Sequence, residues 1–135
     1  MESRTVTTVL DAAPDRVFAY LADIDTVPRW ATEFARELKV VDGRHKVVNG
    51  LGEFFFEIRA DEDSGVIDML AGPSPDELAI FPTRVVDLGG DRSAFTFTMF
   101  RWPGQPQELF EAQHESLRRE FANIEREFSA EPEVS

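Results

Sequence analysis

Apolar residues recur at helical spacing through the last third of the chain. Between about residue 105 and residue 128, one row holds six positions: Phe110, His114, Leu117, Phe121, Ile124 and Phe128. They are separated by 4, 3, 4, 3 and 4 residues, so they share one face of a helix with a 3.6-residue period. The pattern predicts a long amphipathic helix whose apolar stripe contains one titratable side chain.

The middle of the chain alternates apolar and polar residues at the spacing of β-strands. Three segments show apolar rows, which are Phe54, Phe56 and Ile58; Ile67 and Met69; and Phe95, Phe97 and Met99. Asp42-Gly43 is one of several turn signals between the strands. One apolar and one polar face is typical of an antiparallel sheet covered on one side. Pro82 interrupts the strand expected at residues 78–88, and the pattern does not assign its inward face.

The first thirty residues predict a strand followed by two short helices. Residues 4–10 alternate and are rich in β-branched side chains, as strands are. Pro14 opens the first helix at a position where a missing N–H costs nothing. Asp25 and Thr26 are expected to cap a second short helix that contains Trp30.

The length and composition fit one ordered domain. We expect residues 1–129 of the 135 to form it, and residues 130–135 to form a short acidic tail. The chain has 12 Phe against 2 Trp and 1 Tyr. Phe has a large ring without a polar tip, so it suits an apolar interior or the wall of an apolar pocket.

Charge and cysteine content exclude several classes of function. The net charge of -12 disfavours binding to nucleic acid and to anionic membranes, because both require clustered Lys and Arg. The chain has no cysteine, which excludes disulfides, thiolate metal sites and cysteine nucleophiles. No apolar run approaches the roughly 20 residues that span a bilayer, and the N-terminus lacks the apolar core of a signal peptide. We therefore expect a cytoplasmic protein without membrane insertion.

The order of these elements, together with three segments, is similar to a known superfamily. The segments are residues 12–18 (Ala-Ala-Pro-Asp-Arg-Val-Phe), residues 21–24 with Trp30 following, and the closing helix from residue 108 to residue 128. The chain resembles the START-like, Bet v 1-like helix-grip superfamily, and within it the polyketide cyclase/dehydrase-type SRPBCC proteins.

The resemblance implies an α+β fold with an internal cavity. A curved seven-stranded antiparallel sheet would wrap around the long C-terminal helix, with two short helices after the first strand. An apolar cavity would lie between the sheet and the long helix. Phe110, His114 and Leu117 would face this cavity, while the later stripe residues of the helix would be structural.

His114 is the best candidate for catalysis. Its imidazole titrates near neutrality and could act as a general acid or base, or donate a hydrogen bond to a ligand. The alternative is a histidine satisfied by a neighbouring group or by water. Glu111 and His114 match a di-iron helix motif, but the second histidine, His45, lies on a predicted strand. We expect no metal and no cofactor.

Two arginines could hold an anionic group of a ligand. Arg84 follows Pro82 on the interrupted strand, and Arg36 lies in a row with Phe34 and Leu38. A guanidinium that projects inward would bind a carboxylate or phenolate. A strand-end arginine that extends to water is the alternative, and we favour it for both residues.

The leading hypothesis is a protein that binds a small hydrophobic molecule, aromatic or lipid-like, in the internal cavity. The predicted ligand-binding residues are Trp30, Phe54, Phe56, Ile58, Ile67, Met69, Arg84, Phe95, Phe97, Phe110, His114 and Leu117. A structure whose phenylalanines close on each other without an internal void would contradict this hypothesis.

Two alternatives stay open. One is a polyketide cyclase/aromatase-like enzyme that uses the same cavity, with His114 as acid or base and Arg84 or Arg36 orienting the substrate. The other is a protein-interaction module of the chaperone-activator or toxin-like type, which would expose Phe55 and Phe100. The sequence does not decide whether a reaction is catalysed, which ligand binds, or whether the protein is a monomer or a homodimer.

Overall fold

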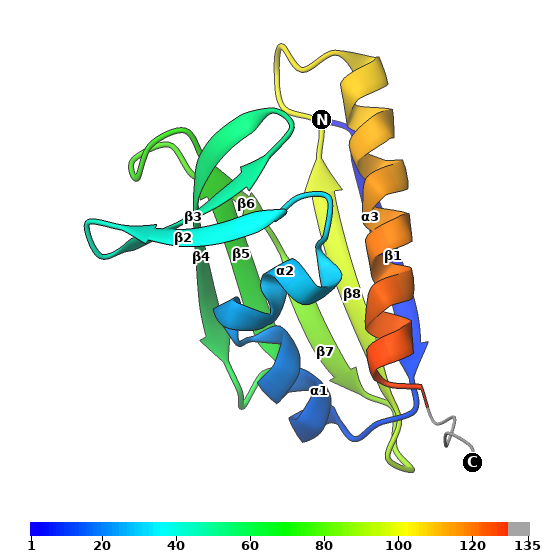
Figure 1. The fold of residues 1–135 in the computed structure, drawn as a ribbon. Coiled ribbons are helices and arrows are strands. Elements are labelled where there is room, and N and C mark those ends of the chain that lie inside the picture. Colours follow the sequence, from blue (N-terminus) through cyan, green and yellow to red (C-terminus); the bar gives the residue numbers. More distant parts are fainter. Residues whose placement is uncertain (130–135) are drawn as a thin grey trace.

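A curved antiparallel sheet grips one long helix, α3 (Gln107–Glu127), as Figure 1 shows. The structure is a computed structural model and describes residues 1–129. The acidic tail predicted for residues 130–135 lies outside the described residues. The strands, in chain order, are β1 (Ser3–Leu10), β2 (Glu37–Val41), β3 (Arg44–Asn49), β4 (Gly52–Asp61), β5 (Val66–Gly72), β6 (Ala79–Phe81), β7 (Thr83–Asp87) and β8 (Ser93–Phe100).

The described sheet has eight strands, one more than the sequence predicts. Pro82 divides the strand expected at residues 78–88 into β6 and β7, because proline cannot donate a hydrogen bond to a sheet ladder. β6 pairs with β5, and β7 pairs with β5 and β8. The order across the sheet is β1-β8-β7-β5-β4-β3-β2, with every pairing antiparallel. The predicted α+β helix-grip class is confirmed.

Strand register places the predicted apolar rows on the concave face of the sheet. Phe95 lies opposite Thr8 of β1 and Val85 of β7. Cross-strand partners share a face, so one inward row runs across these three strands. In β6, Phe81 lies opposite the predicted inward residue Met69. This pairing assigns the inward face that the sequence left open for the interrupted strand.

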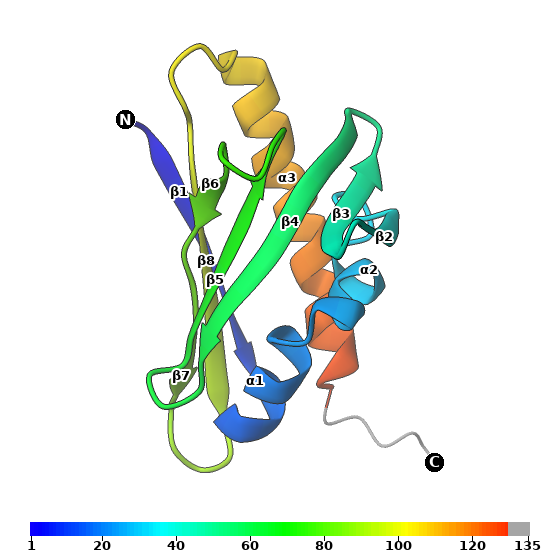
Figure 2. The same cartoon turned by 90° about the vertical axis from the view of Figure 1, so that its left-hand side faces the viewer.

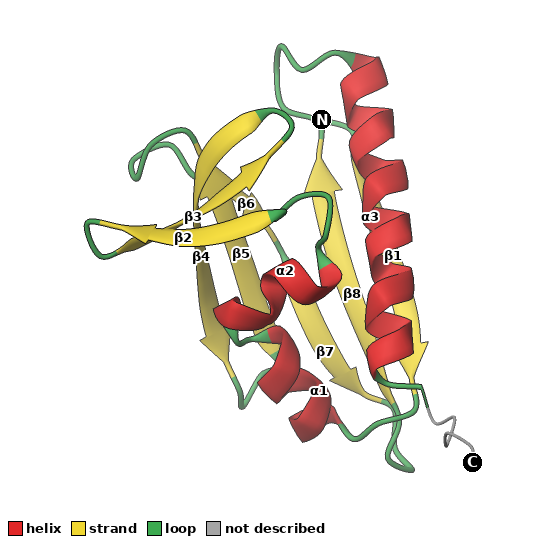
Figure 3. Ribbon diagram, viewed as in Figure 1, coloured by secondary structure: helices red, strands yellow, loops and turns green. Residues whose placement is uncertain are grey.

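Two short helices follow β1, as predicted (Figure 3). They are α1 (Pro14–Leu21) and α2 (Val27–Trp30), separated by a 3-10 turn, η1 (Ile24–Thr26). Pro14 is the first residue of α1, and Thr26 occupies the N-cap position of α2 as expected, but no side-chain hydrogen bond caps that helix. Asp23 caps η1 instead, accepting the N–H of Asp25 at 3.0 Å. Because η1 inserts an extra turn, the Thr26 hydroxyl donates to the carbonyl oxygens of two earlier residues, Tyr20 and Asp23.

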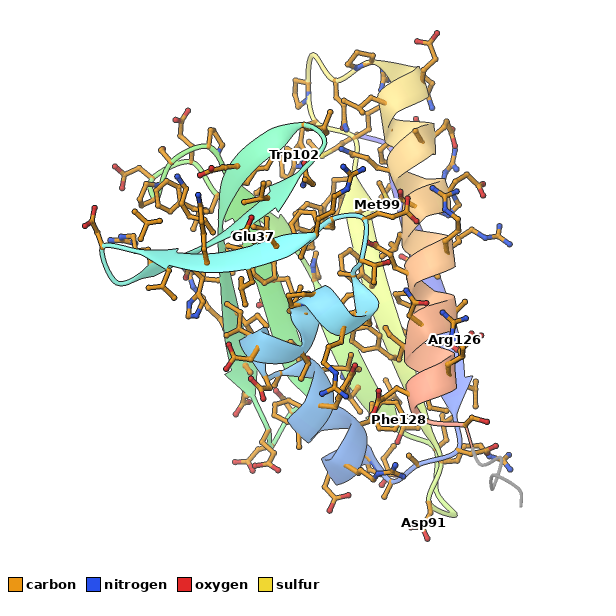
Figure 4. All side chains as sticks on the ribbon, viewed as in Figure 1. Glu37, Asp91, Met99, Trp102, Arg126 and Phe128 are labelled. Atoms are coloured by element: carbon orange, nitrogen blue, oxygen red, sulfur yellow. The ribbon has the colours of Figure 1, made fainter. Side chains whose placement is uncertain are left out.

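The short helices cover one end of the concave face and leave the other end to α3. We call the end near α1 the lower half and the end near the β8–α3 connection the upper half, as oriented in Figure 1. In the side view, α1 and α2 lie on the same face of the sheet as α3 (Figure 2). Phe128 marks the lower end of α3, and Met99 lies near the upper end of β8 (Figure 4).

Side chains of β1 fasten this strand to α3. Arg4 donates to both carboxylate oxygens of Glu111, at 2.9 and 2.7 Å, and this contact lowers the pKa of Glu111. The Thr8 hydroxyl donates to Glu125 at 2.6 Å. The partners are 107 and 117 residues apart in the chain. β1 is thus held by β8 through its backbone and by α3 through its side chains.

Candidate ligand-binding site on the concave face

Nearly all of the predicted ligand-binding residues lie together between the sheet and the helices. The apolar members, buried or half-buried in one cluster, are Trp30, Phe54, Phe56, Ile58, Ile67, Met69, Phe95, Phe97, Phe110 and Leu117. His114 stands on α3 within the same stripe and is half-buried. The structure therefore assembles residues of α2, β4, β5, β8 and α3 on one face, while their role in binding stays a prediction.

The two candidate arginines do not join this group. Arg84 is exposed on β7 between Thr83 and Val85, which are both buried on the concave face. Successive strand residues point to opposite faces, so Arg84 lies on the outer face, where its Nε donates to the Ser64 carbonyl at 3.4 Å. Arg36 is also exposed. Both arginines therefore match the alternative in which the guanidinium extends to water.

In the lower half of the concave face, aromatic rings pack against each other. Phe95 is fully buried and stacks on Phe121 of α3, with ring centroids 5.5 Å apart. The ring of Trp30 meets Phe95 edge-on at 6.4 Å. Ile67 and Ile124 are also fully buried. This half is a closely packed core, as protein interiors are.

In the upper half, three aromatic side chains of the sheet stay half-buried, although Phe110 of α3 and Met99 of β8 are buried there. Phe54, Phe81 and Phe97 are half-buried on β4, β6 and β8. Phe34, between α2 and β2, is also half-buried, with its ring centroid 5.5 Å from that of Phe56. The sequence did not propose Phe34 or Phe81 as ligand contacts. In the sequence, Phe34 stands in a row with Arg36 and Leu38, and Phe81 directly precedes Pro82. Only the folded structure shows on which face these two rings lie.

His114 has no hydrogen-bond partner among the described residues. Its side chain is half-buried, one helical turn below the buried ring of Phe110. The imidazole lies close enough to Glu111 to help lower the pKa of that carboxyl, although Arg4 has the larger effect. The alternative of a histidine that is hydrogen-bonded to a neighbouring protein group therefore does not apply to the described residues. The ring is available to a solvent molecule or a ligand.

Glu120 is a buried carboxyl that the sequence analysis missed. It is 4% exposed, and its Oε2 accepts the backbone N–H groups of Glu33 at 3.0 Å and Phe34 at 2.9 Å. Burial raises the pKa of Glu120 to about 7, against the opposing effect of those two N–H donors. The available signal was its spacing, three residues after Leu117 and four before Ile124, which places it beside the apolar stripe.

The segment that Glu120 holds joins α2 to β2, and we call residues 31–36 the strap. Glu33 of the strap accepts hydrogen bonds from Arg119 at 2.7 and 2.9 Å and from Ser116 at 2.5 Å. The hydrogen bond from Arg119 is the main reason why the pKa of Glu33 falls to about 2. Just before the strap, Asn123 donates to the Trp30 carbonyl at 2.9 Å. Side chains of α3 thus fasten the strap along the helix.

The indole N–H of Trp30 has no partner. Trp30 is 2% exposed, and within residues 1–129 its Nε1 is the one buried side-chain nitrogen or oxygen without a hydrogen bond. A buried donor left unsatisfied costs about 1–3 kcal/mol. Such a group requires an explanation, and water or a ligand atom is the usual one.

Two surface depressions lie apart from α3. One is lined by Met1, Glu2, Arg101, Trp102, Pro103 and Gly104, and the other by Gly43, Arg44, His45, Phe55, Phe56, Glu57, Pro75 and Leu78. Neither includes a residue of α3, so neither is a cavity between the sheet and the helix. Phe55 and Phe100 are half-buried rather than exposed, and the Phe100 ring contacts Trp102 at 5.9 Å.

Solved structures match nearly the whole chain. A START superfamily protein from Mycobacterium smegmatis has a TM-score of 0.70 at 14% identity, covering 93% of this chain and 96% of that one. The Zhui aromatase/cyclase from Streptomyces sp. R1128 has a TM-score of 0.64 at 18% identity, covering 93% and 90%. The Aha1 dimer from Colwellia psychrerythraea has a TM-score of 0.70 at 12% identity, covering 98% and 99%.

This chain has the START-like, Bet v 1-like SRPBCC fold. No model of a known protein family matches the chain, and no curated protein matches its sequence. At these identities the likeness to the START-like structures concerns the fold alone. Among the residues that the structure describes, no three His, Cys, Asp or Glu side chains gather as metal ligands would. Across residues 1–129, no helix is both long and apolar enough to cross a bilayer.

Proposed function

We propose that the protein binds a small, predominantly apolar molecule, aromatic or lipid-like, between the sheet and α3. The half-buried aromatic residues of the upper half are the observation that supports this proposal most directly. Phe54, Phe81 and Phe97 lie on the concave face, yet the short helices leave them partly open to solvent. Covering such surface is favourable by roughly 25 cal/mol for each square ångström removed from water.

His114 supplies the polar contact at this proposed site. It lies on the stripe of α3 and has no hydrogen-bond partner among residues 1–129, so its imidazole can donate to or accept from a ligand. Ligand sites commonly combine apolar walls with a few polar groups that fix orientation. Similarity in fold to a START superfamily protein adds support for a ligand-binding role.

Native mass spectrometry of the purified chain tests the proposal. We expect a retained small molecule, seen as a mass above that of the protein alone. Phe54 and Phe55 form a matched pair, because these adjacent half-buried residues point to opposite faces of β4. Phe54→Gln should reduce the fraction of protein that retains the molecule, whereas Phe55→Gln should leave that fraction unchanged. Equal retention by both variants, or no retained molecule and no binding of an added apolar probe, would overturn the proposal.

A second candidate is an enzyme that acts on a polyketide-like substrate in the same place. Two side chains support it, the unpartnered His114 and the buried Glu120, whose pKa is raised to about 7. A fold shared with an aromatase/cyclase adds to this support. In this case His114→Ala would bind a polyketide-like test substrate but lose its turnover. Unchanged turnover would remove His114 from any catalytic role.

For the assembly, we propose a monomer or a homodimer. The likeness to the Aha1 structure, which is described as a dimer, supports the second state. Light scattering after size-exclusion chromatography separates the two by mass. A mass well above twice 15.3 kDa would contradict both states.

A further inference from the structure

The interior between sheet and helices contains several fully buried polar side chains, and among the described residues all but one of these are paired. Ser93 donates its hydroxyl to the Ala12 carbonyl at 2.7 Å, and Thr83 donates to the Ile67 carbonyl. The Glu120 carboxyl accepts two backbone N–H groups. Within the described chain, the Trp30 indole N–H is the single buried side-chain donor left without an acceptor. A polar atom brought into this interior would therefore find one vacant donor there.

A continuous series of aromatic rings links Trp30 to the open upper half. Phe81 contacts Phe97 at 5.8 Å, and both rings are half-buried. Phe97 contacts Phe121 at 6.4 Å, and Phe121 stacks on Phe95 at 5.5 Å. Phe95 meets the Trp30 ring at 6.4 Å. A flat apolar molecule that parts these rings would replace aromatic contacts with similar ones, up to the indole.

We propose that Trp30 Nε1–H is the polar anchor of the bound molecule, and that the ligand is an apolar, aromatic compound with a neutral hydrogen-bond acceptor such as a ketone oxygen. This inference rests on the proposed function and specifies the chemical class of its ligand. A plain hydrocarbon would leave the donor unpaired. A carboxylate would be buried beside apolar rings without a cation, in a chain of net charge -12.

The test uses the two tryptophans of the chain as reporters. Trp30 and Trp102 give two indole N–H signals in a ¹⁵N-labelled sample, and Trp102→Phe assigns them. The probes are 2-acetylnaphthalene and 2-isopropenylnaphthalene, which differ in one atom group, an oxygen replaced by CH₂. We expect the acetyl probe to move the Trp30 indole proton downfield and to bind about tenfold more tightly than the hydrocarbon. The hydrocarbon should leave that proton without the downfield shift.

Trp30→Phe keeps an aromatic ring and removes the donor. In this variant the tenfold preference should fall to about one, with the hydrocarbon still bound. Trp102→Phe is the matched control, because Trp102 is exposed and lies beyond β8, and it should keep the preference. If Trp30→Phe does not fold, the titration of the unsubstituted chain decides by itself.

The outcomes separate this inference from the proposed function. Equal affinity for both probes, or an unmoved Trp30 indole signal at saturation with the acetyl probe, would overturn the anchor role while apolar binding stands. A preference that persists in Trp30→Phe would do the same. If neither probe binds to the folded chain and no molecule is retained in native mass spectrometry, both proposals are overturned together.

Discussion

The upper and lower halves of the concave face are built from the same kind of residue but differ in exposure. Phe95 in the lower half is fully buried, whereas Phe97, two residues further along the same strand, is half-buried. Both point inward and both contact Phe121. The difference comes from α1 and α2, which cover the lower half and leave the upper half to α3. Phe95 and Phe97 therefore differ in burial according to what is packed over them, and Met99, the next inward residue of the strand, is buried again.

The largest expected effect tests whether the two halves differ in energy as they do in burial. Phe95→Ala should lower the free energy of unfolding by about 3–5 kcal/mol, because it empties a closed core. Phe54→Ala, in the upper half, should cost roughly 1–2 kcal/mol, because that ring is already partly in water. Urea unfolding followed by circular dichroism measures both. Equal losses would contradict the division into two halves.

Glu120, beside the stripe of α3, should make stability depend on pH. Its pKa is about 7 in the folded protein against an ordinary 4.5, so the folded state holds this proton more tightly than the unfolded chain does. Stability should therefore fall as the pH rises from 4.5 to 7, by roughly 3 kcal/mol. Neighbouring charges act in opposite directions, because Glu33 raises this pKa and Arg119 lowers it.

Glu120→Gln is the variant that isolates this effect. The amide oxygen can still accept the two strap N–H groups, and it carries no charge at any pH. The variant should equal the unsubstituted chain near pH 4.5 and exceed it in stability above pH 7, as measured by thermal unfolding at several pH values. Parallel pH profiles for the two proteins would show that Glu120 is not the group responsible.

The ion pair that fastens the strap should contribute much less than Glu120. Arg119 and Glu33 are 61% and 37% exposed, so water and salt screen their attraction. Arg119→Gln should lower the free energy of unfolding by about 0.2–1 kcal/mol, and less at high salt. The contribution of Glu33 to stability has the opposite pH dependence to that of Glu120. It is present above pH 4.5 and is lost as the pH falls toward 2. A loss in the free energy of unfolding that does not change with salt would contradict a contribution from a solvent-exposed ion pair.

The smallest expected change in stability belongs to His114. Its side chain makes no hydrogen bond within residues 1–129, so His114→Ala should shift the free energy of unfolding by less than about 0.5 kcal/mol. The same variant should weaken binding of a retained or added ligand that has a polar group. A large loss of stability would identify His114 as structural and would remove the polar contact from the proposed site.

Alternation along the chain was sufficient to predict the inward rows of three strands. Phe54, Phe56 and Ile58 share the concave face, as their spacing of two requires, and the long stripe of α3 is buried as predicted. These features depend on local periodicity and on burial of one face, which a single sequence contains. The strand interrupted by Pro82 could not be assigned, because its inward face depends on which neighbours β6 and β7 pair with.

The site was harder to predict, because its polar groups depend on partners far away in the chain. Glu120 is 86 residues from the Phe34 N–H that it binds, and no spacing within the helix indicates that contact. The vacant Trp30 donor is a property of everything packed around it. The position of Arg84 could not be predicted either, because a shift of one residue in strand register decides whether its side chain faces the interior or the outer face of the sheet.

The fastening of β1 has a consequence for the order of folding. β1 pairs with β8, and its side chains bond to helix residues 107 and 117 positions further on. Synthesis therefore leaves β1 without its sheet neighbour until β8 (Ser93–Phe100) has been made, and closing so long a loop slows the final pairing. Until α3 emerges, the Phe-rich concave face stays uncovered, which is the interval in which a chain of this topology is most open to aggregation.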